Sequence, residues 1–467
     1  MDLIGRSSEL ESLEKSYQKP TGQLTIIYGR RRIGKSRLIK TFCIKKQHYY
    51  LEGIEGLDTQ GQIHSAFQQL ENQIGTRLYK GIEFTNWQAF LHYLTDKIVR
   101  VPGRKKIIVF DELQWLAVKR TKLISIIKYF WDNHWKEQGV DLILCGSIAS
   151  YMINSVVKSR ALYGRANQIV HLEGLLPFEV RKFLPNRSIE EVIKYQLILG
   201  AVPKYLEEIN PRISFEKNIN NLMFTKSGIL KDEYERIFYS QFPEYKLYQN
   251  LIIALSQGAK SHLELSKFIK IPSGGGLSRY LNILEEAAFI EKSLKFKFAA
   301  RNSIDKYFLA DAYVSFYLKY IRPNLNLINK NINKDIFARV VKPVWAPWLG
   351  LAFESFCRKH AVLIAERLNF ANHVIDFGQI IQKDKNALQI DLAYLRSDNV
   401  VTICEIKYHD SEIDTGLIPE LERKKALLKL PRKYSLKTAL ISLRGPTKSL
   451  ERSAYLNYSL VAEDLFR

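Results

Sequence analysis

Cysteine is scarce in this sequence. Four of the 467 residues are cysteines, Cys43, Cys145, Cys357 and Cys404, without the close pairs that zinc sites and redox motifs use. Two of them stand within apolar, strand-like runs. The sequence therefore excludes a disulfide framework or a cysteine-rich zinc module and predicts buried free thiols.

Long apolar runs are also absent. No window reaches the roughly 18 apolar residues of a membrane span. The N-terminal stretch MDLIGRSSELESLEKSYQK is polar and acidic, where a signal peptide is basic and then apolar. We therefore expect a cytoplasmic protein that does not enter the membrane. Because low-complexity tracts are missing too, we expect order nearly throughout.

Acidic residues are too few to balance the basic ones. Lys and Arg number 70 against 48 Asp and Glu, which gives a net charge of +22. Such a charge attracts polyanions, and nucleic acid is the most abundant of these in the cytosol, so DNA is the predicted partner. Diffuse charge that only keeps the protein soluble is the alternative.

A phosphate-binding pattern stands near the start of the chain. Residues 29–36 read G-x-x-x-x-G-K-S, between an apolar run at 24–28 and a helical spacing at 37–42. Backbone N–H groups and the helix start would hold phosphates, Lys35 would bridge the β- and γ-phosphates, and the Ser36 hydroxyl would ligate Mg²⁺. ATP and Mg²⁺ are thus the predicted cofactors. The candidate nucleotide-binding residues of the loop are Gly29, Arg30, Arg31, Arg32, Ile33, Gly34, Lys35, Ser36 and Arg37, with the three arginines facing solvent or a polyanion.

Two later apolar strands end in residues that suit the same chemistry. The first strand is Lys106-Ile-Ile-Val-Phe-Asp111, followed by Glu112. This pattern predicts that Asp111 holds the metal ion and that Glu112 acts as general base toward the attacking water. Asp141-Leu-Ile-Leu-Cys-Gly-Ser147 places Ser147 as a sensor of the γ-phosphate or of that water. A helix N-cap is the alternative role for Ser147, and both roles are compatible.

Five ordered motifs together resemble one family. The segments LIGRSSELESLEK (3–15), IIYGRRRIGKSRL (26–38), VFDELQWL (109–116), LILCGSIASYM (142–152) and LYGR (162–165) are similar to the archaeal-type ATPases, AAA+-like relatives of the signal-transduction ATPases. The resemblance covers about residues 1–235. It implies a P-loop core with a helical lid, and it implies Gly5 and Arg6 as contacts on the adenine side.

The same resemblance assigns two further residues. Arg165 is similar to the arginine that reads the γ-phosphate, in cis or from a neighbouring subunit of a homo-oligomer; a surface arginine is the alternative. LGAVPKYLEEI (199–209) resembles the Gly-Gly-x-Pro segment of the lid, which implies that Pro203 packs against the nucleotide. Ala201 stands where that family has its second glycine.

Three helical patterns follow Tyr245, and then alternating residues suit a hairpin. We interpret them as a winged helix with residues 277–286 as recognition helix, Ser278 and Arg279 near its start, and Lys292, Lys295 and Lys297 on the wing. A packing module without DNA contact is the alternative. The aromatic residues of 300–345 are expected to be core.

The last part of the sequence holds acids in apolar surroundings. Glu354 lies in a helical pattern, Asp391 in a strand, and Glu405 shares one face of the next strand with Lys407. Two carboxylates at a strand pair hold a hard divalent ion, and a nearby lysine positions water. The pattern resembles the PD-(D/E)xK nucleases, which implies Glu354 as helical acid, Asp391 and Glu405 as metal ligands and Lys407 as catalytic lysine. Exposed salt bridges or an inactive scaffold are the alternatives.

These inferences combine into a multidomain α/β protein. We expect a P-loop ATPase core at 1–170, a helical lid at 171–238, a winged helix at 239–300, a helical connector at 301–345 and a restriction-endonuclease-like α/β domain at 346–467. The predicted function is an ATPase that binds DNA and couples its cycle to the nuclease-like domain. The alternative is an ATP-gated switch that binds DNA or protein and cleaves nothing.

Overall fold

A computed structural model of the chain describes residues 3–75, 83–118, 122–242, 244–293, 305–330, 334–382, 388–428 and 430–467. It contains two compact units. One comprises Met1–Gly174 with Tyr239–Pro243, and the other Leu175–Phe238 with Glu244–Arg467. None of the helices in the described ranges combines the length and the apolar character that crossing a membrane requires.

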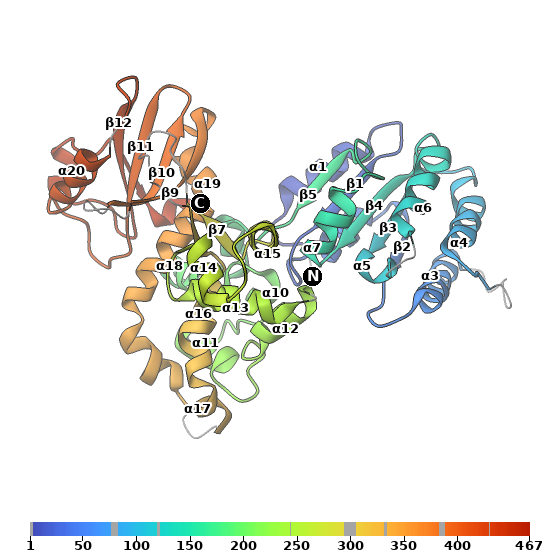
Figure 1. Ribbon diagram of the computed structural model, residues 1–467, viewed down its shortest axis with the longest axis horizontal. Coiled ribbons are helices and arrows are strands. Elements are labelled where there is room, and N and C mark those ends of the chain that lie inside the picture. Colours follow the sequence, from blue (N-terminus) through green and yellow to red (C-terminus); the bar gives the residue numbers. More distant parts are fainter. Residues whose placement is uncertain are drawn as a thin grey trace. The chain divides into compact units, whose positions relative to one another are not determined.

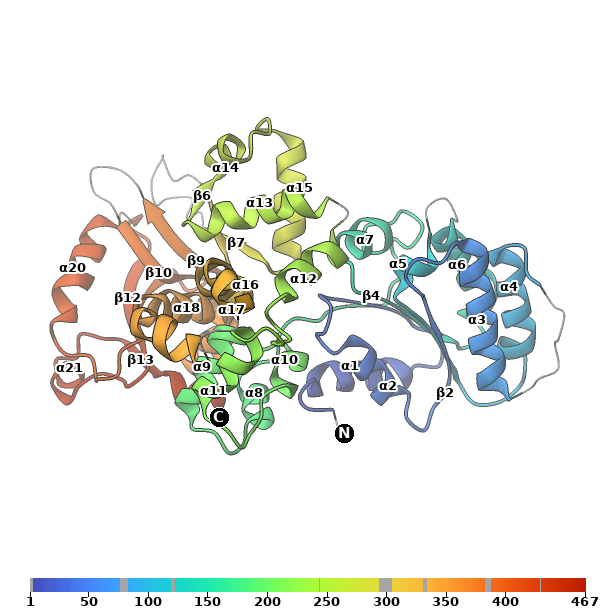
Figure 2. The same ribbon diagram turned by 90° about the horizontal axis from the view of Figure 1, so that it is seen from below.

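The first unit is built on a parallel sheet with helices on both faces (Figures 1 and 2). Its five strands lie in the order β2-β3-β4-β1-β5, so that β4, the fourth strand along the chain, lies between β3 and β1. The strands are β1 (Leu24–Tyr28), β2 (Gln47–Glu52), β3 (Lys106–Asp111), β4 (Asp141–Gly146) and β5 (Gln168–His171). The helices are α1 (Ser7–Tyr17), α2 (Lys35–Cys43), α3 (Thr59–Ile74), α4 (Trp87–Leu94), α5 (Leu113–Leu116), α6 (Leu123–Phe130) and α7 (Ala149–Tyr151).

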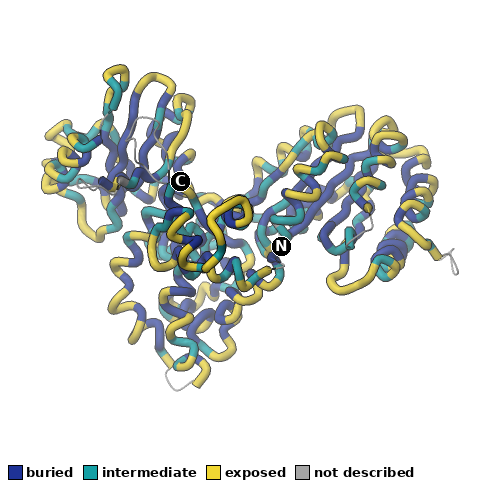
Figure 3. The backbone as a smooth tube through the Cα atoms, viewed as in Figure 1, coloured by how far each residue is buried: buried dark blue, intermediate teal, exposed yellow. Residues whose placement is uncertain are grey.

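Burial explains why the two central acid-bearing strands form. Every residue of β3 and β4 is buried, as expected for parallel strands that are covered on both faces. In Figure 3 these strands are dark blue along their length, whereas the surrounding helices are exposed on their outer sides. The carboxyl ends of β1, β3 and β4 meet at one edge because the strands are parallel, and this edge carries the loops that follow them.

The second unit begins with helices and continues into a small antiparallel sheet. Later in this unit, three helices and three short strands follow one another as helix, strand, helix, helix, strand, strand, and the strands lie in the order β6-β8-β7 in the sheet. The predicted wing residues Lys295 and Lys297 lie outside the described residues. The helices are α8 (Pro177–Phe183), α9 (Ile189–Leu199), α10 (Pro203–Glu207), α11 (Phe215–Met223), α12 (Glu233–Gln241), α13 (Tyr245–Ser256), α14 (His262–Ile269) and α15 (Gly275–Glu286), and the strands are β6 (Lys260–Ser261), β7 (Ile290–Lys292) and β8 (Lys306–Leu309).

An aromatic core joins the following helices to the first ones of this unit. Tyr313, Phe316, Tyr317 and Tyr320 are buried, and the ring of Tyr317 stacks on that of Tyr234 with 4.6 Å between centroids. The expectation that aromatic residues of this segment are core is confirmed for these four. The helices are α16 (Ala312–Phe316), α17 (Leu325–Lys330), α18 (Ala346–Lys359) and α19 (Ala361–Arg367).

The chain ends in a mixed five-stranded sheet in the order β13-β12-β11-β10-β9. Strands β9, β10 and β11 pair antiparallel, whereas β11, β12 and β13 pair parallel. Helix α18 packs against β10 and β11. The elements are β9 (Val374–Gln382), β10 (Leu388–Arg396), β11 (Val400–Lys407), α20 (Leu417–Leu427), β12 (Ser435–Ser442), α21 (Lys448–Arg452) and β13 (Tyr458–Val461).

The multidomain α/β fold predicted from the sequence is confirmed, with a parallel sheet first and a separate mixed sheet at the end. All four cysteines are free and buried, as predicted. The five segment boundaries, the winged helix and the endonuclease-like assignment stay predictions.

Candidate active sites

The loop after β1 depends on its two glycines. Gly29 has a φ of 159°, and a Cβ there would lie 2.2 Å from the carbonyl oxygen of Leu172, so no other residue fits without moving the backbone. Gly34 has a φ of 95° and is the N-cap of α2. The glycines thus let the loop turn tightly between strand and helix and leave its N–H groups at the helix start.

Lys35 lies inside this loop. Lys35 is only 5% exposed, and its Nζ donates to the carbonyl oxygens of Gly29 and Arg30, each at 3.0 Å. Of the neighbouring arginines, Arg31 is exposed, whereas Arg30 and Arg32 are half-buried. The expectation that the three arginines face solvent or a polyanion is therefore met fully by Arg31 and only partly by Arg30 and Arg32.

Ser36 and Asp111 meet although they are far apart in sequence. Ser36 Oγ donates to Asp111 Oδ2 at 2.7 Å, and the backbone N–H of Glu112 donates to Oδ1 at 2.8 Å. The Tyr50 hydroxyl also donates to Oδ2. Burial raises the pKa of Asp111, but hydrogen bonds from thiol, phenol, hydroxyl and backbone donors outweigh it, so its pKa lies below the ordinary value.

This pair suits a magnesium ion. A hydroxyl oxygen and an ionised carboxylate face each other, and hard divalent cations prefer such oxygen ligands. The carboxylate is almost fully buried, at 1% exposed, so its charge is little screened by solvent. The residues present therefore fit the ion that the sequence predicts.

Glu112 is held beside Ser147 at the ends of β3 and β4. Ser147 Oγ donates to Glu112 Oε2 at 2.7 Å, and Gln114 Nε2 donates to both the same carboxylate and Ser147 Oγ, the latter at 3.2 Å. Glu112 has a φ of 48°, a left-handed conformation that non-glycine residues adopt rarely and that recurs at functional sites. The structure thus brings the predicted base and the predicted sensor together.

The Gly5–Arg6 turn lies against the loop. Arg6 is buried, and its guanidinium donates to the carbonyl oxygen of Ile33 at 3.2 Å, to the carbonyl oxygen of Glu173 and to Glu9 Oε1 at 3.0 Å. Both Gly5 and Arg6 have positive φ angles. These contacts fix the loop, and the adenine-side role stays a prediction.

Arg165 is paired with an acid. Its Nε and Nη2 donate to the carboxylate of Asp132 at 2.8 and 3.0 Å, and the guanidinium lowers the pKa of that carboxyl. Pro203 is the first residue of α10 in the second unit, after Ala201, which takes the left-handed conformation with a φ of 57°. The roles of Arg165 and Pro203 at a nucleotide stay predictions.

Carboxylates also converge on the mixed sheet. Leu392 pairs with Cys404, so Asp391 and Glu405 are the next opposed residues of β10 and β11. Asp391 Oδ2 accepts the backbone N–H of Ile406 at 3.3 Å. Burial and the charge of Asp391 raise the pKa of Glu405, which is 2% exposed.

Two lysines bind the Glu405 carboxylate. Lys407 Nζ lies 2.9 Å from Glu405 Oε1, and Lys424 Nζ, from α20, contacts Oε2. Both ammonium groups also pair with Glu420, each at 3.3 Å. The predicted pairing of Glu405 with Lys407 is therefore present, and Lys424 adds a second, buried cation.

Glu354 approaches the same acids from α18. Burial, followed by the charge of Asp391, raises its pKa to about 7. Arg358 Nη1 lies 3.8 Å from Glu354 Oε2, while Arg358 Nε donates to Glu291 Oε1 on β7. The three acids of the predicted motif thus influence one another, as like charges in one place do.

The structure supports a divalent ion less strongly at Asp391 and Glu405 than at Ser36 and Asp111. Asp391 and Glu405 are opposed, buried acids that offer oxygen ligands, and a cation would stabilise the carboxylate of Glu405, whose pKa is raised. Within the described ranges, however, no cluster of three or more His, Cys, Asp and Glu side chains is arranged to hold a metal ion. The ligand pair Asp391 and Glu405 fits the ion in chemistry, and its metal role stays a prediction.

Comparison with known proteins identifies the first part of the chain. Residues 3–209 match the family described as an ATPase domain predominantly from Archaea. This segment is similar to the archaeal-type ATPase domains. Residues 317–418 match a second family, described as archaeal and bacterial proteins of unknown function, and this range contains Glu354, Asp391, Glu405 and Lys407.

Two relatives and one solved structure are similar to parts of the chain. An uncharacterized protein of Methanocaldococcus jannaschii is 24% identical over 409 residues, which are 87% of this chain and 88% of that protein. An uncharacterized ATP-binding protein of the same organism is 46% identical over 44 residues, 9% of this chain and 75% of that protein. The Walker-type ATPase of Pyrococcus abyssi superimposes with a TM-score of 0.50 at 18% identity, covering 68% of this chain and 96% of that one. The last likeness shows the fold.

Sequence reasoning missed several partners of these side chains. In the first unit they are Tyr50 on Asp111, Gln114 between Glu112 and Ser147, and Asp132 on Arg165. In the second unit Lys424 was missed. Of these, only Gln114 carried a usable signal, because it lies two residues after the acid within the motif VFDELQWL.

Proposed function

We propose that the chain binds and hydrolyses ATP with Mg²⁺ and acts on DNA. The observation that carries the ATPase proposal is the convergence of Lys35, the Ser36–Asp111 pair and the Glu112–Ser147 pair at the carboxyl ends of β1, β3 and β4. Parallel α/β sheets bind ligands at this edge. The family described for residues 3–209 supports the same activity.

Each side chain has a role in this proposal. Lys35 exchanges its two carbonyl contacts for phosphate oxygens of ATP, while the loop N–H groups bind the β-phosphate. Ser36 and Asp111 hold Mg²⁺, which neutralises phosphate charge when bound. Glu112 takes a proton from the attacking water, and Ser147, hydrogen-bonded to Glu112, orients that carboxylate and contacts the water or the γ-phosphate.

Equilibrium dialysis tests the binding step. The full chain is expected to retain ATP when Mg²⁺ is present, and Asp111→Asn is expected to bind ATP more weakly in Mg²⁺ but equally in EDTA. The matched control is Asp96→Asn, which removes an exposed acid of the first unit outside the Ser36–Asp111 pair. Failure of the wild-type chain to retain ATP contradicts the proposal at its base.

The DNA proposal rests on the middle of the second unit. The order α13, β6, α14, α15, β7, β8 with an antiparallel sheet supports the predicted winged helix, in which α15 is the candidate recognition helix. Arg279 near its start is exposed, whereas Lys292 is ion-paired with Asp305 at 3.2 Å. Arg279 is therefore the better phosphate or base contact of the two.

Salt dependence checks this contact. Duplex DNA is expected to bind more weakly as salt rises, and Arg279→Ala is expected to lower the affinity and flatten that dependence by about one phosphate contact. Lys448→Ala, an exposed cation on α21, is the control that leaves both unchanged. Salt-independent binding by the wild-type chain, or equal effects of the two substitutions, contradicts the assignment.

We also propose that the acids of the mixed sheet form a phosphodiester-cleaving site driven by the ATPase cycle. The mutual influence of Glu354, Asp391 and Glu405 beside Lys407 supports it. The alternative is an ATP-gated switch that binds DNA or protein without cutting, and the observation in its favour is the occupation of both Glu405 oxygens by lysine ammonium groups.

Cleavage assays separate these two candidates. DNA incubated with Mg²⁺ or Mn²⁺ is expected to be cut by the wild-type chain and left intact by Lys407→Ala. Cleavage that persists in the substituted chain indicates a contaminant. A wild-type chain that cuts no DNA supports the switch.

Both candidates share two further proposals. If Arg165 acts in trans, the chain forms a homo-oligomer. We propose a cytoplasmic location for either candidate.

A further inference from the structure

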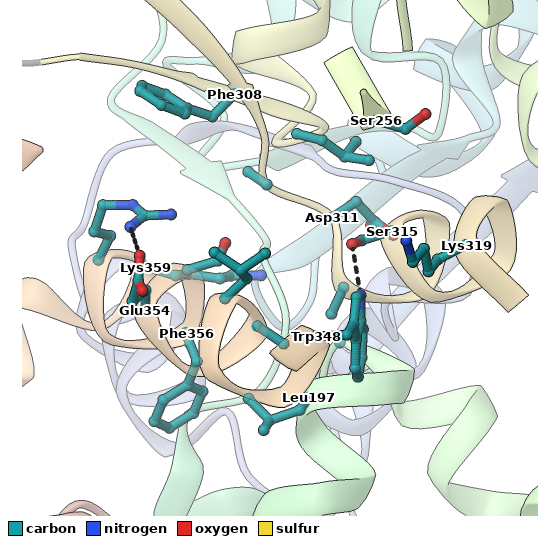
Figure 4. Close-up of a pocket in the computed structure, with 18 of the residues that line it drawn as sticks. Leu197, Ser256, Phe308, Asp311, Ser315, Lys319, Trp348, Glu354, Phe356 and Lys359 are labelled. Atoms are coloured by element: carbon teal, nitrogen blue, oxygen red, sulfur yellow. Dashed lines mark hydrogen bonds and ion pairs between the residues drawn. The ribbon is translucent and has the colours of Figure 1, made fainter. Parts of the chain in front are cut away.

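The second unit encloses a pocket that no step of the proposed ATPase cycle uses (Figure 4). Its volume is about 570 Å³, within the range of sites for small organic groups. Helix α18 supplies one wall, and α9, α16 and β8 supply others. All of its lining residues belong to the second unit.

The walls of the pocket are largely aromatic and aliphatic. Phe308, Tyr320, Trp348 and Phe356 line it, and Trp348 is fixed by a hydrogen bond from its Nε1 to Ser315 Oγ at 3.2 Å. Leu351, which also lines it, is 61% exposed, so an apolar edge faces solvent. Such walls favour a flat, apolar ligand face.

Three residues of the lining carry a buried polar atom without a partner among the described residues. Gln196 and Gln379 line the pocket at 3% and 5% exposed, and in the described structure neither Oε1 atom receives a hydrogen bond. Arg358 Nη1 likewise has no hydrogen-bond acceptor and lies 3.8 Å from Glu354 Oε2. The two glutamines and Arg358 place polar side chains among the apolar walls, and such a lining suits a ligand whose edge carries both donors and acceptors.

The pocket adjoins the acids of the mixed sheet through one residue. Glu354 lines the pocket and also interacts electrostatically with Asp391 and Glu405. Two exposed lysines, Lys319 and Lys359, belong to the lining as well and suit backbone phosphates. Figure 4 shows Glu354 and Lys359 on the same helix as Trp348.

We propose that this pocket receives one unpaired nucleobase of a DNA strand whose backbone passes the acids at Glu354. A base has apolar faces for the aromatic walls and a polar edge for the two glutamines and Arg358, and bases that enzymes read outside a duplex are held by such stacking and hydrogen bonds. The inference rests on the proposed action on DNA and specifies its substrate: DNA with a single-stranded end or an extruded base.

The test compares two DNAs on the full chain in EDTA, which prevents cleavage. One is a blunt duplex, and the other is the same duplex with a single-stranded overhang that contains 2-aminopurine. Fluorescence anisotropy is expected to show about tenfold tighter binding of the overhang DNA, the size of one stacked base. The 2-aminopurine emission is expected to fall on binding, because stacking quenches it.

Two substitutions assign the effect to the pocket. Gln379→Met removes one acceptor with little change of shape, and Phe308→Ala removes one aromatic wall; each is expected to reduce the overhang preference and leave blunt-duplex affinity unchanged. Gln257→Met, an exposed glutamine outside the lining, is the matched control. An unchanged urea midpoint of unfolding, together with unchanged blunt-duplex affinity, in all three variants shows that they are folded.

The outcomes are distinct. Equal affinity of the wild-type chain for both DNAs, unchanged 2-aminopurine emission, or a preference that survives both substitutions overturns the pocket proposal while DNA binding stands. Binding of neither DNA overturns both proposals. If excess adenosine removes the overhang preference as effectively as unlabelled overhang DNA does, and Gln379→Met weakens that competition, the occupant is a free nucleoside and the strand assignment is wrong.

Discussion

The two sites of this chain bury acids in opposite ways. Asp111 is surrounded by hydrogen-bond donors, which lower its pKa although it is almost fully buried. Glu405 is buried and Glu354 is half-buried close to another acid, Asp391, and the pKa values of both are raised. Both arrangements suit a cation, but for different reasons.

The two sites differ in the groups that stabilise their carboxylates before a cation binds. Neutral donors keep Asp111 ionised without occupying the site with charge, so an incoming cation need not displace one. In the mixed sheet, Lys407 and Lys424 supply positive charge that partly offsets the repulsion between acids. A metal there has to compete with these lysines, whereas at Ser36 and Asp111 it does not.

The largest expected effect belongs to the first site. Lys35→Ala is expected to lower the turnover of ATP by about 10²–10³-fold, because it removes the charge that would stabilise the phosphates. Steady-state phosphate release measures it, and Lys40→Ala, an exposed lysine of the same helix, is the control. An unchanged rate of ATP turnover in Lys35→Ala would contradict the assignment of the ATP site to this loop.

At the second site, Lys424→Met is expected to lower the free energy of unfolding by about 3 kcal/mol, since it leaves buried Glu405 with one cation fewer. Chemical denaturation measures the loss. Lys425→Met, at the neighbouring but more exposed position of α20, is expected to cost less than about 1 kcal/mol. Restoration of stability by the double substitution Lys424→Met with Glu405→Gln would assign the loss to the unpaired charge, and similar losses in the two single variants would contradict the comparison.

The raised pKa of Glu354 predicts a pH dependence. Its folded pKa of about 7 exceeds the ordinary value of 4.5, so the folded chain holds a proton that the unfolded chain releases, and this contribution to stability is lost as pH rises from 4.5 through 7. Glu354→Gln is therefore expected to be more stable than the wild type at pH 8, by up to about 3 kcal/mol, and similar to it at pH 4.5.

Urea unfolding at both pH values measures this effect. Glu366→Gln, an exposed acid on α19, is the control and should follow the wild type at each pH. A wild-type advantage over Glu354→Gln at pH 8 would show that the carboxylate is already neutralised by a cation.

The smallest expected effect concerns Ser147. Ser147→Ala is expected to lower kcat by about tenfold with little change in KM, because the hydroxyl orients Glu112 in the reaction rather than binding ATP. Ser155→Ala, exposed and outside the site, is the control. A change confined to KM would move Ser147 from the reacting water to the phosphates, and no change at all would leave it as the helix cap.

Local patterns predicted the elements that carry the sites. The strands that end at Tyr28, Asp111 and Gly146 were expected from apolar runs followed by turn or acidic residues, and the structure contains them. The hydrogen bonds of Asp111 and Glu112 were less accessible to such reasoning. Tyr50 reaches Asp111 from a neighbouring strand, and no spacing within either motif encodes that contact.

The mixed sheet shows the same limit more strongly. Alternation along one strand predicted that Glu405 and Lys407 share a face, and their ion pair bears this out. Lys424 lies on a helix separated from that strand by a loop, so its contact with Glu405 depends on how α20 packs on the sheet. The Arg358 pairs with Glu291 and Glu354 likewise depend on packing between elements.

By itself the sequence determined the phosphate loop, the acids at the strand ends and the order of α/β segments, because these depend on neighbouring residues and on the periodicity of a single element. Tertiary structure alone decided which donors surround Asp111, which lysines bind Glu405 and which glutamines line the pocket. Burial, pKa and hydrogen bonding are properties of groups brought together from distant parts of the chain, and no local pattern specifies them.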